Sequence, residues 1–132
     1  MATVSSGPGS STALVQHGAT IKIVVRSPLD GREVTLDALV DTASQLTFVE
    51  SSHLQGWAPL PLVAAARFAG AGGRFSSDIF LAEVEIIGLN LRELTEIVLD
   101  DLGGRQAILG RNQLRDCVLV YDGRKGTVEL RK

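Results

Sequence analysis

The sequence predicts a small all-β domain in which a closed, barrel-like sheet carries one short helix near the C-terminus. Three observations support this fold class. Short apolar segments of strand length recur along the chain, turns rich in glycine separate them, and a single segment has a helical pattern. The chain has 132 residues, which fits one domain because single domains usually contain roughly 100–200 residues.

The domain is expected to cover residues 19–132. Residues 1–18 are rich in Ser, Gly, Thr and Ala and contain a Gly-Pro-Gly-Ser-Ser run. This composition is typical of a flexible arm. Within the arm, residues 12–16 could pair as a strand if the domain offers an open sheet edge. The sequence therefore predicts a flexible N-terminal arm followed by one domain.

The first part of the domain is predicted to contain three strands around a polar loop. Residues 19–26 place Ile, Ile and Val at every second position, and a Ser-Pro-Leu-Asp-Gly turn follows them. Residues 33–40 are again extended and end in Ala-Leu-Val, so this second strand stops directly before Asp41. Residues 46–49 predict a short apolar strand, and residues 50–56 fit a turn of helix or an irregular loop.

The middle of the chain predicts a long hairpin and a further strand. Residues 63–68 and 75–87 flank a tip of glycine and alanine, which predicts two extended arms that meet at a flexible end. Residues 89–99 are rich in Leu, Ile and Val and fit strand or helix by periodicity alone. We favour strand, because the neighbouring segments are strands and a Gly-Leu-Asn turn lies at its start.

The C-terminal part predicts a short apolar strand, the helix and a final hairpin. The strand covers residues 107–109. Residues 111–117 have the helical pattern, with Leu114 as the side chain that faces the core. Residues 118–121 and 127–130 flank an Asp-Gly-Arg-Lys-Gly turn and complete the hairpin.

The composition argues against several classes of partner. The formal net charge is -2 and no run of Lys or Arg could neutralise a phosphate backbone, so nucleic acid is not expected. The longest apolar stretch, around residues 58–66, contains two prolines and is shorter than the ~18 residues that suggest a membrane span. His17, His53 and Cys117 lack the spacing of zinc ligands, so we expect no metal and no cofactor. A single cysteine cannot form an internal disulfide, which is compatible with the expected cytoplasmic location.

The most suggestive polar segment is Asp41-Thr42-Ala43-Ser44, which directly follows an apolar strand. A carboxylate placed where a buried strand breaks into a turn lies in a low-dielectric setting with free backbone donors around it. This is a setting that suits a catalytic acid or base. The same tetrapeptide also fits an Asx turn that only closes a strand, so on its own it leaves both interpretations open.

Two more segments are candidates for a site. The first combines a short apolar strand, a glycine turn and a helix start, and it consists of Ile108, Leu109, Gly110, Arg111 and Asn112. By itself this segment indicates only local shape, with the Asn as a helix cap. The second is the hairpin tip, which consists of Gly70, Ala71, Gly72 and Gly73. It lacks the Lys-[Ser/Thr] pair of a phosphate-binding loop.

Taken in order, the three segments resemble those of the retropepsin-like aspartic proteases, the family of retroviral proteases and their small cellular and bacterial relatives. The apolar-apolar-Asp-Thr-x-Ser run at residues 39–44 is similar to the family's catalytic Asp-Thr-Gly-[Ser/Ala] loop. The glycine-tipped hairpin resembles the flap that closes over substrate, and the apolar-apolar-Gly segment resembles the one that precedes the family's short helix. The resemblance covers roughly residues 20–130 and implies the retropepsin (acid protease) fold.

The resemblance also implies an aspartic endopeptidase that acts as a homodimer on a peptide or protein substrate. Aspartic proteases need two carboxylates that share one proton: one activates water while the other polarises the scissile carbonyl. This chain offers one such motif, so two copies of Asp41 would meet across a two-fold axis. By the same resemblance, Thr42 would form a hydrogen bond across that axis, and Ser44 would hold the outer carboxylate oxygen.

Two positions depart from the family pattern. Ala43 stands where the family has glycine, which predicts a slower enzyme. Gln45 stands where an acid would pair with Arg111, so the arginine is expected to contact a carbonyl or another carboxylate such as Asp100. Two alternatives stay open for this reason. One is a retropepsin-fold binding or dimerisation module without turnover, and the other is an unrelated small β domain with a chance Asp-Thr pair.

Overall fold

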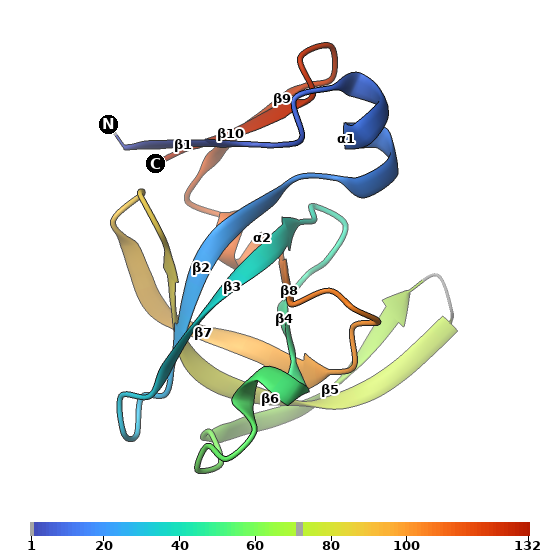
Figure 1. Cartoon of the computed structure of the whole chain (residues 1–132). Coiled ribbons are helices and arrows are strands. Elements are labelled where there is room, and N and C mark those ends of the chain that lie inside the picture. The colour runs from blue at the N-terminus through green and yellow to red at the C-terminus, as the bar shows by residue number, and fades with distance from the viewer. Residues whose placement is uncertain (1, 71–72) are drawn as a thin grey trace.

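In the part of the chain that the computed structural model describes, residues 2–70 and 73–132, seven strands form one sheet that closes on itself (Figure 1). They are β2 (Thr20–Arg26), β3 (Glu33–Val40), β4 (Thr47–Glu50), β5 (Leu62–Gly70), β6 (Gly73–Ile86), β7 (Leu91–Asp100) and β8 (Ala107–Leu109). The strand order is β2-β3-β8-β4-β7-β6-β5. An additional pairing of β2 with β6 closes a six-stranded barrel and leaves β5 outside the ring.

A second sheet of three strands lies at one end of the barrel (Figure 1). It contains β1 (Thr3–Ser6), β10 (Thr127–Arg131) and β9 (Val118–Asp122), in the antiparallel order β1-β10-β9. The helical segments are α1 (Ser11–His17), the 3-10 helix η1 (Ser51–Leu54) and α2 (Arg111–Leu114). Because α2 connects β8 of the barrel to β9, it joins the two sheets.

The all-β class and the closed barrel expected from the sequence are confirmed. The segment at residues 89–99, for which we favoured strand over helix, forms β7. The expected long hairpin is formed by β5 and β6, and residues 71–72 of its tip lie outside the described residues. The helix expected over residues 111–117 is shorter, because α2 ends at Leu114.

The N-terminal segment differs from the flexible arm expected for residues 1–18. β1 pairs with β10, with Val4 opposite Leu130. Residues 12–16, considered as a strand, belong instead to α1, so the structure has a second α-helix where one was expected. The Ser10 hydroxyl caps this helix by accepting a hydrogen bond from the Ala13 N–H at 3.2 Å. Leu14 is only 3% exposed, so burial of this side chain holds the helix to the domain.

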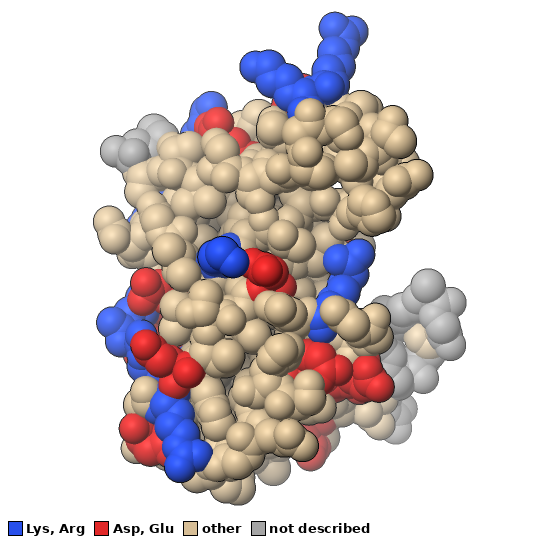
Figure 2. All heavy atoms as spheres, viewed as in Figure 1, with Lys and Arg blue, Asp and Glu red and all other residues tan. Residues whose placement is uncertain are grey.

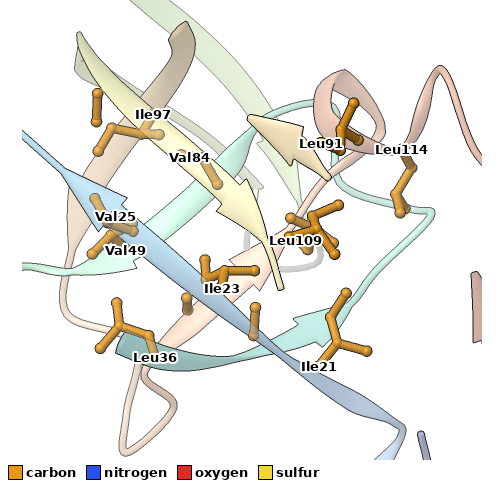
Figure 3. Packing of buried hydrophobic residues seen from close by; sticks show 14 of the residues in the cluster. Ile21, Ile23, Val25, Leu36, Val49, Val84, Leu91, Ile97, Leu109 and Leu114 are labelled. Atoms are coloured by element: carbon orange, nitrogen blue, oxygen red, sulfur yellow. The ribbon is translucent and has the colours of Figure 1, made fainter. Parts of the chain in front are cut away.

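Aliphatic side chains from every strand of the ring fill the barrel (Figure 3). In β2, Ile21, Ile23 and Val25 are buried, and the intervening residues point outward. This is the alternation from which the strand was predicted, because only one face of the strand contacts the core. Fully burying a side chain such as Ile23 stabilises the fold by about 1.5–3 kcal/mol.

Charged side chains on the outside of the barrel form ion pairs between neighbouring strands. Lys22 lies opposite Asp37, and its Nζ is 2.8 Å from Oδ1 of that aspartate. Arg26 lies opposite Glu33 on one side and Glu83 on the other, and it forms ion pairs with both. On the face shown in Figure 2, residues of both signs are interspersed.

No helix among the described residues is long and apolar enough to cross a membrane.

Candidate active site

Asp41 lies at the point where β3 ends and the chain leaves the barrel. β3 and β8 are parallel neighbours, with Val40 opposite Leu109. The N–H of Asp41 continues this pairing by donating to the carbonyl of Leu109 at 3.1 Å. Residues 41–46 then lead to β4, which pairs with the opposite edge of β8. Both ends of the loop are therefore fixed to the same central strand.

The carboxylate of Asp41 is oriented by its own loop. The N–H of Ala43 donates to Oδ1 of Asp41 at 2.9 Å, and the N–H of Ser44 donates to the Asp41 carbonyl at 3.2 Å. This is the Asx turn that the sequence allowed. Asp41 is partly exposed, and within the described residues its carboxylate has no other hydrogen bond or ion pair. The turn therefore holds a carboxylate that is still available to a further partner.

At Gly110, directly before α2, the backbone packs closely against the loop. A Cβ atom at this position would lie 2.1 Å from the carbonyl oxygen of Leu46, so no other residue fits without a backbone shift. The N–H of Gly110 donates to the hydroxyl of Thr47 at 3.2 Å, and this hydroxyl donates to Oδ1 of Asn112 at 2.9 Å. Thr47 was missed by the sequence analysis, although a threonine within an apolar strand next to the loop was an available signal.

Backbone hydrogen bonds join the loop to the first two residues of α2. The N–H of Arg111 donates to the carbonyl of Ser44 at 2.8 Å, and the N–H of Asn112 donates to the carbonyl of Gln45 at 3.1 Å. The guanidinium of Arg111 donates from Nη1 to the carbonyl of Thr42 at 2.9 Å. The sequence left open whether this arginine contacts a carbonyl or another carboxylate. In the structure it contacts a carbonyl, that of Thr42.

The hydroxyl of Ser44 has a different partner from the one implied by the resemblance. It donates to the carbonyl of Leu46 at 2.6 Å. In this chain, the N–H of Ala43 binds the Asp41 carboxylate instead. Thr42 is exposed, and its implied hydrogen bond to a second copy stays a prediction.

The predicted flap is the end of the β5–β6 hairpin. Gly70 and Gly73 face each other as the last pair of the ladder, and Ala71 and Gly72 lie outside the described residues. Among the residues that the structure describes, no hydrogen bond or ion pair joins this end of the hairpin to residues 41–46. The structure therefore brings two of the three predicted segments, the Asp41 loop and the segment around Gly110, together.

The base of the same hairpin does contact the loop. Leu46 of the loop clusters with Ile79 of β6 and Val98 of β7, and partly buried Phe48 packs against them. All three core members of this cluster are at most 7% exposed. The position of the hairpin base is therefore fixed relative to the Asp41 loop by apolar packing.

A second carboxylate, at the end of β4 that lies away from the Asp41 loop, has a structural role. Glu50 at the end of β4 accepts hydrogen bonds from the hydroxyl and the N–H of Ser52, at 2.6 and 2.8 Å, and from the N–H of Leu102 at 3.2 Å. These bonds, led by that of the Ser52 hydroxyl, lower the pKa of Glu50 to about 2. The carboxylate thereby fixes η1 and the loop after β7 to β4.

Nothing in the described part of the chain forms a group of three or more His, Cys, Asp or Glu side chains that could hold a metal ion.

Comparisons with known proteins concern the fold. No protein-family model matches the sequence, and no curated protein matches it. The protease of EIAV, solved in complex with the inhibitor HBY-793, is similar in structure with a TM-score of 0.55. The two sequences are 19% identical, and the match covers 74% of this chain and 85% of that protease.

Two foamy virus structures are also similar. The solution structure of the simian foamy virus (mac) protease has a TM-score of 0.49 at 14% identity, with 73% of this chain and 91% of that chain covered. The foamy viral protease-reverse transcriptase in complex with an RNA/DNA hybrid has a TM-score of 0.48 at 12% identity, with 73% and 12% covered. The similarity to the EIAV protease shows that this chain has the fold of the retroviral proteases.

Proposed function

We propose that this chain, which has the retropepsin-like fold, is an aspartic endopeptidase whose active site takes one Asp41 from each of two copies. The observation that carries the proposal is the state of the Asp41 carboxylate. It is partly exposed and is held by a single N–H in a loop whose ends are both fixed to β8. One such carboxylate per chain supports a site that is completed by a second copy.

The proposed chemistry follows from placing two carboxylates side by side. Both cannot remain ionised at short distance, so the pair holds one proton. The ionised member takes a proton from water as that water attacks the scissile carbonyl, and the protonated member donates a hydrogen bond to the carbonyl oxygen. When the C–N bond breaks, the leaving amine takes up a proton from the pair. The products are a carboxylic acid and an amine.

The loop supplies orientation in this mechanism. The hydrogen bond from Ala43 directs Oδ1 of Asp41, and the contacts of Gly110 and Arg111 keep the loop in place. Fixed orientation of a reacting group lowers the barrier because the ordering entropy is lost on folding, before substrate binds. We propose that an extended peptide or protein segment binds between the loop and the β5–β6 hairpin, whose tip spans residues 70–73.

A second candidate function is a binding or dimerisation module without turnover. It is favoured by Ala43 and Gln45, which depart from the pattern of the active family. Backbone strain at Ala43 could have been one reason for lost activity, and the structure argues against it. Among the described residues, Asn90 is the only non-glycine residue with a positive φ. Ala43 therefore has an ordinary backbone conformation, and the loop forms around its methyl group without strain.

Peptide cleavage is the test that separates the two candidates. The natural protein is incubated with a peptide library from acidic to neutral pH, beside Asp41→Asn and a matched control, Asp116→Asn, which alters an exposed aspartate near α2. We expect cleavage by the natural protein and by the control, none by Asp41→Asn, and specific activity that falls on dilution. Equal turnover by Asp41→Asn would exclude the proposed mechanism, and absence of cleavage in every sample would favour the binding module.

A further inference from the structure

We infer that the proposed endopeptidase selects peptides with an acidic side chain a few residues from the scissile bond, and that Arg105, together with His17 and Thr20, binds this carboxylate. This selectivity rests on the proposed function and deepens it, because it names the substrate class of the same site. A cavity beside β3, the charge of its wall and its position relative to Asp41 support it.

The cavity lies where three segments that are distant in the sequence meet. It has a volume of about 400 Å³. His17 ends α1, Thr20 begins β2, and Arg105 belongs to the loop between β7 and β8, and all three line the cavity. The fold therefore gathers one polar side chain from each segment at a hollow in the surface.

The wall of this cavity offers positive charge and hydrogen-bond donors. Arg105 has a guanidinium with five N–H donors, which stays protonated in proteins. His17 can supply a ring N–H, and Thr20 a hydroxyl. Among the described residues, none of these three side chains has a hydrogen bond or an ion pair, and no Asp or Glu lines the cavity. The wall is therefore complementary to a carboxylate, which accepts strong hydrogen bonds from charged donors.

Arg105 differs from the basic residues on the barrel wall. Lys22 and Arg26 form ion pairs with acids on neighbouring strands. The acids closest to Arg105 in the sequence, Asp100 and Asp101, accept hydrogen bonds from backbone N–H groups of their own loop, at 2.8 and 3.0 Å. The side chain of Arg105 is exposed. Its charge is therefore available to a carboxylate from another molecule.

Leu39 connects the cavity to the strand that carries Asp41. Thr20 lies opposite Leu39 in the β2–β3 pairing. A Cβ atom at Gly18, which lines the cavity directly after α1, would lie 2.7 Å from Cδ1 of Leu39. Leu39 also lines a second cavity of about 250 Å³, which shares Thr20 and Arg105 with the first. The two cavities therefore follow the outer side of β3.

The second cavity does contain one acid, Asp37. The carboxylate of Asp37 is already paired, because its Oδ1 lies 2.8 Å from Nζ of Lys22. This acid is therefore not a competing partner for Arg105, and the positive charge of the shared wall is retained.

The alternation of β3 places Leu39 and Asp41 on the same face. Ala38 is buried and Val40 packs against the barrel core, so Leu39 between them points outward. Asp41 is the next position on the outward face, and two residues of a strand span about 6.6 Å. An extended peptide whose scissile bond lies at Asp41 therefore passes the cavities within a few residues of that bond.

Peptide binding measured apart from cleavage tests this assignment. All proteins carry Asp41→Asn, so that bound peptide stays intact. The probes are fluorescent peptide libraries with glutamate fixed at one position, compared by anisotropy with the same libraries with glutamine there. Because hydrogen bonds between charged groups are stronger than neutral ones, we expect glutamate to improve the affinity by about tenfold or more in at least one position.

Variants of the cavity wall assign this preference to residues. Arg105→Gln should reduce the ratio of the two affinities to about one, and His17→Gln should reduce it in part. Arg105→Glu should instead favour lysine over glutamine at the same position. Arg124→Gln, which changes an exposed arginine in the β9–β10 turn, is the matched control and should keep the glutamate preference. Circular dichroism melts check that each variant is folded.

Equal binding of the glutamate and glutamine libraries, no binding of either, or a glutamate preference that survives Arg105→Gln would overturn the inference. These outcomes are separable from those of the proposed function. If Arg105→Gln removed the glutamate preference but the natural protein cleaved no library, the acidic-peptide site would stand and the peptidase would fail. If cleavage depended on Asp41 and no library showed a glutamate preference, the peptidase would stand and the acidic-peptide site would fail.

Discussion

Gly110 and Leu46 are in contact through their backbones, and a Cβ atom on the glycine would lie 2.1 Å from the carbonyl oxygen of the leucine. This contact joins the loop that carries Asp41 to the turn that begins α2. The closeness explains why a glycine must directly follow the apolar strand β8. A side chain here would separate the loop from the turn and break the hydrogen bonds on both sides of the contact.

Gly110→Ala is therefore expected to destabilise the protein and to abolish any cleavage activity. Inserting a methyl group into a tightly packed contact typically costs about 1–3 kcal/mol. The matched control is Gly123→Ala in the β9–β10 turn, where a Cβ atom would be 3.4 Å from a Tyr121 ring carbon. Urea unfolding measures the change, and equal stability of the two variants would show that the loop adjusts to the added methyl group.

Arg111→Ala is expected to have a smaller effect. The guanidinium is exposed and donates to the carbonyl of Thr42, so the variant loses one hydrogen bond. We expect a loss of about 1 kcal/mol in unfolding free energy and weaker dimerisation, because the loop becomes less ordered. Arg124→Ala, a change of an exposed arginine in the β9–β10 turn, serves as the control. If both variants had the natural dimer constant and stability, the Arg111 contact would have no energetic role.

Acid sensitivity is expected from Glu50. Hydrogen bonds from Ser52 and Leu102 lower its pKa from 4.5 to about 2, so the folded state favours the ionised form. This contribution to stability is complete above about pH 4.5 and is lost as the pH falls toward 2. Glu50→Gln should therefore show a flatter dependence of Tm on pH within that range and a lower Tm at neutral pH.

The control for this experiment is Glu96→Gln, which changes an exposed glutamate on β7. Thermal melts of both variants and the natural protein between pH 2 and pH 7 provide the comparison. An identical pH profile for Glu50→Gln and the natural protein would mean that the Glu50 hydrogen bonds persist when the carboxyl group is protonated.

Much of the fold and part of the site could be predicted from the sequence, because both depend on local patterns. The strand over residues 107–109 was expected with its observed bounds, since its apolar run is ended by Gly110. The Asp41 loop was expected where the strand before it ends. In both cases, strand alternation and a turn residue decide the local structure without help from distant contacts.

The N-terminal structure could not be predicted, because its stability comes from distant residues. α1 has seven residues, which is too short for a clear helical period. Its buried Leu14 clusters with Ala19 and Val128, and the latter lies at the other end of the chain. The partner of the Ser44 hydroxyl was missed for a similar reason. The choice between Asp41 and Leu46 depends on the loop path, which is set by contact with Gly110.

Ala43→Gly tests whether the alanine that stands in place of the family's glycine slows the proposed reaction. The Ala43 N–H binds the Asp41 carboxylate, and its methyl group is exposed beside it. A substrate backbone approaching the carboxylate would meet that methyl group, and a displacement near 1 Å can reduce a rate by about 100-fold. The ordinary φ of Ala43 means that the glycine variant relieves no strain in the loop. We therefore expect a higher kcat for Ala43→Gly with a small loss of stability from the added chain entropy.

Ala13→Gly in α1, where the backbone N–H also makes a capping hydrogen bond, is a control for the general cost of an added glycine. Cleavage rates and urea unfolding of the two variants separate catalysis from stability. If kcat for Ala43→Gly equalled or fell below the natural value while the variant stayed folded, the methyl group would be part of a working site. The expectation from the sequence that Ala43 slows the enzyme would then be wrong, because the substrate would be bound in a position that the methyl group does not obstruct.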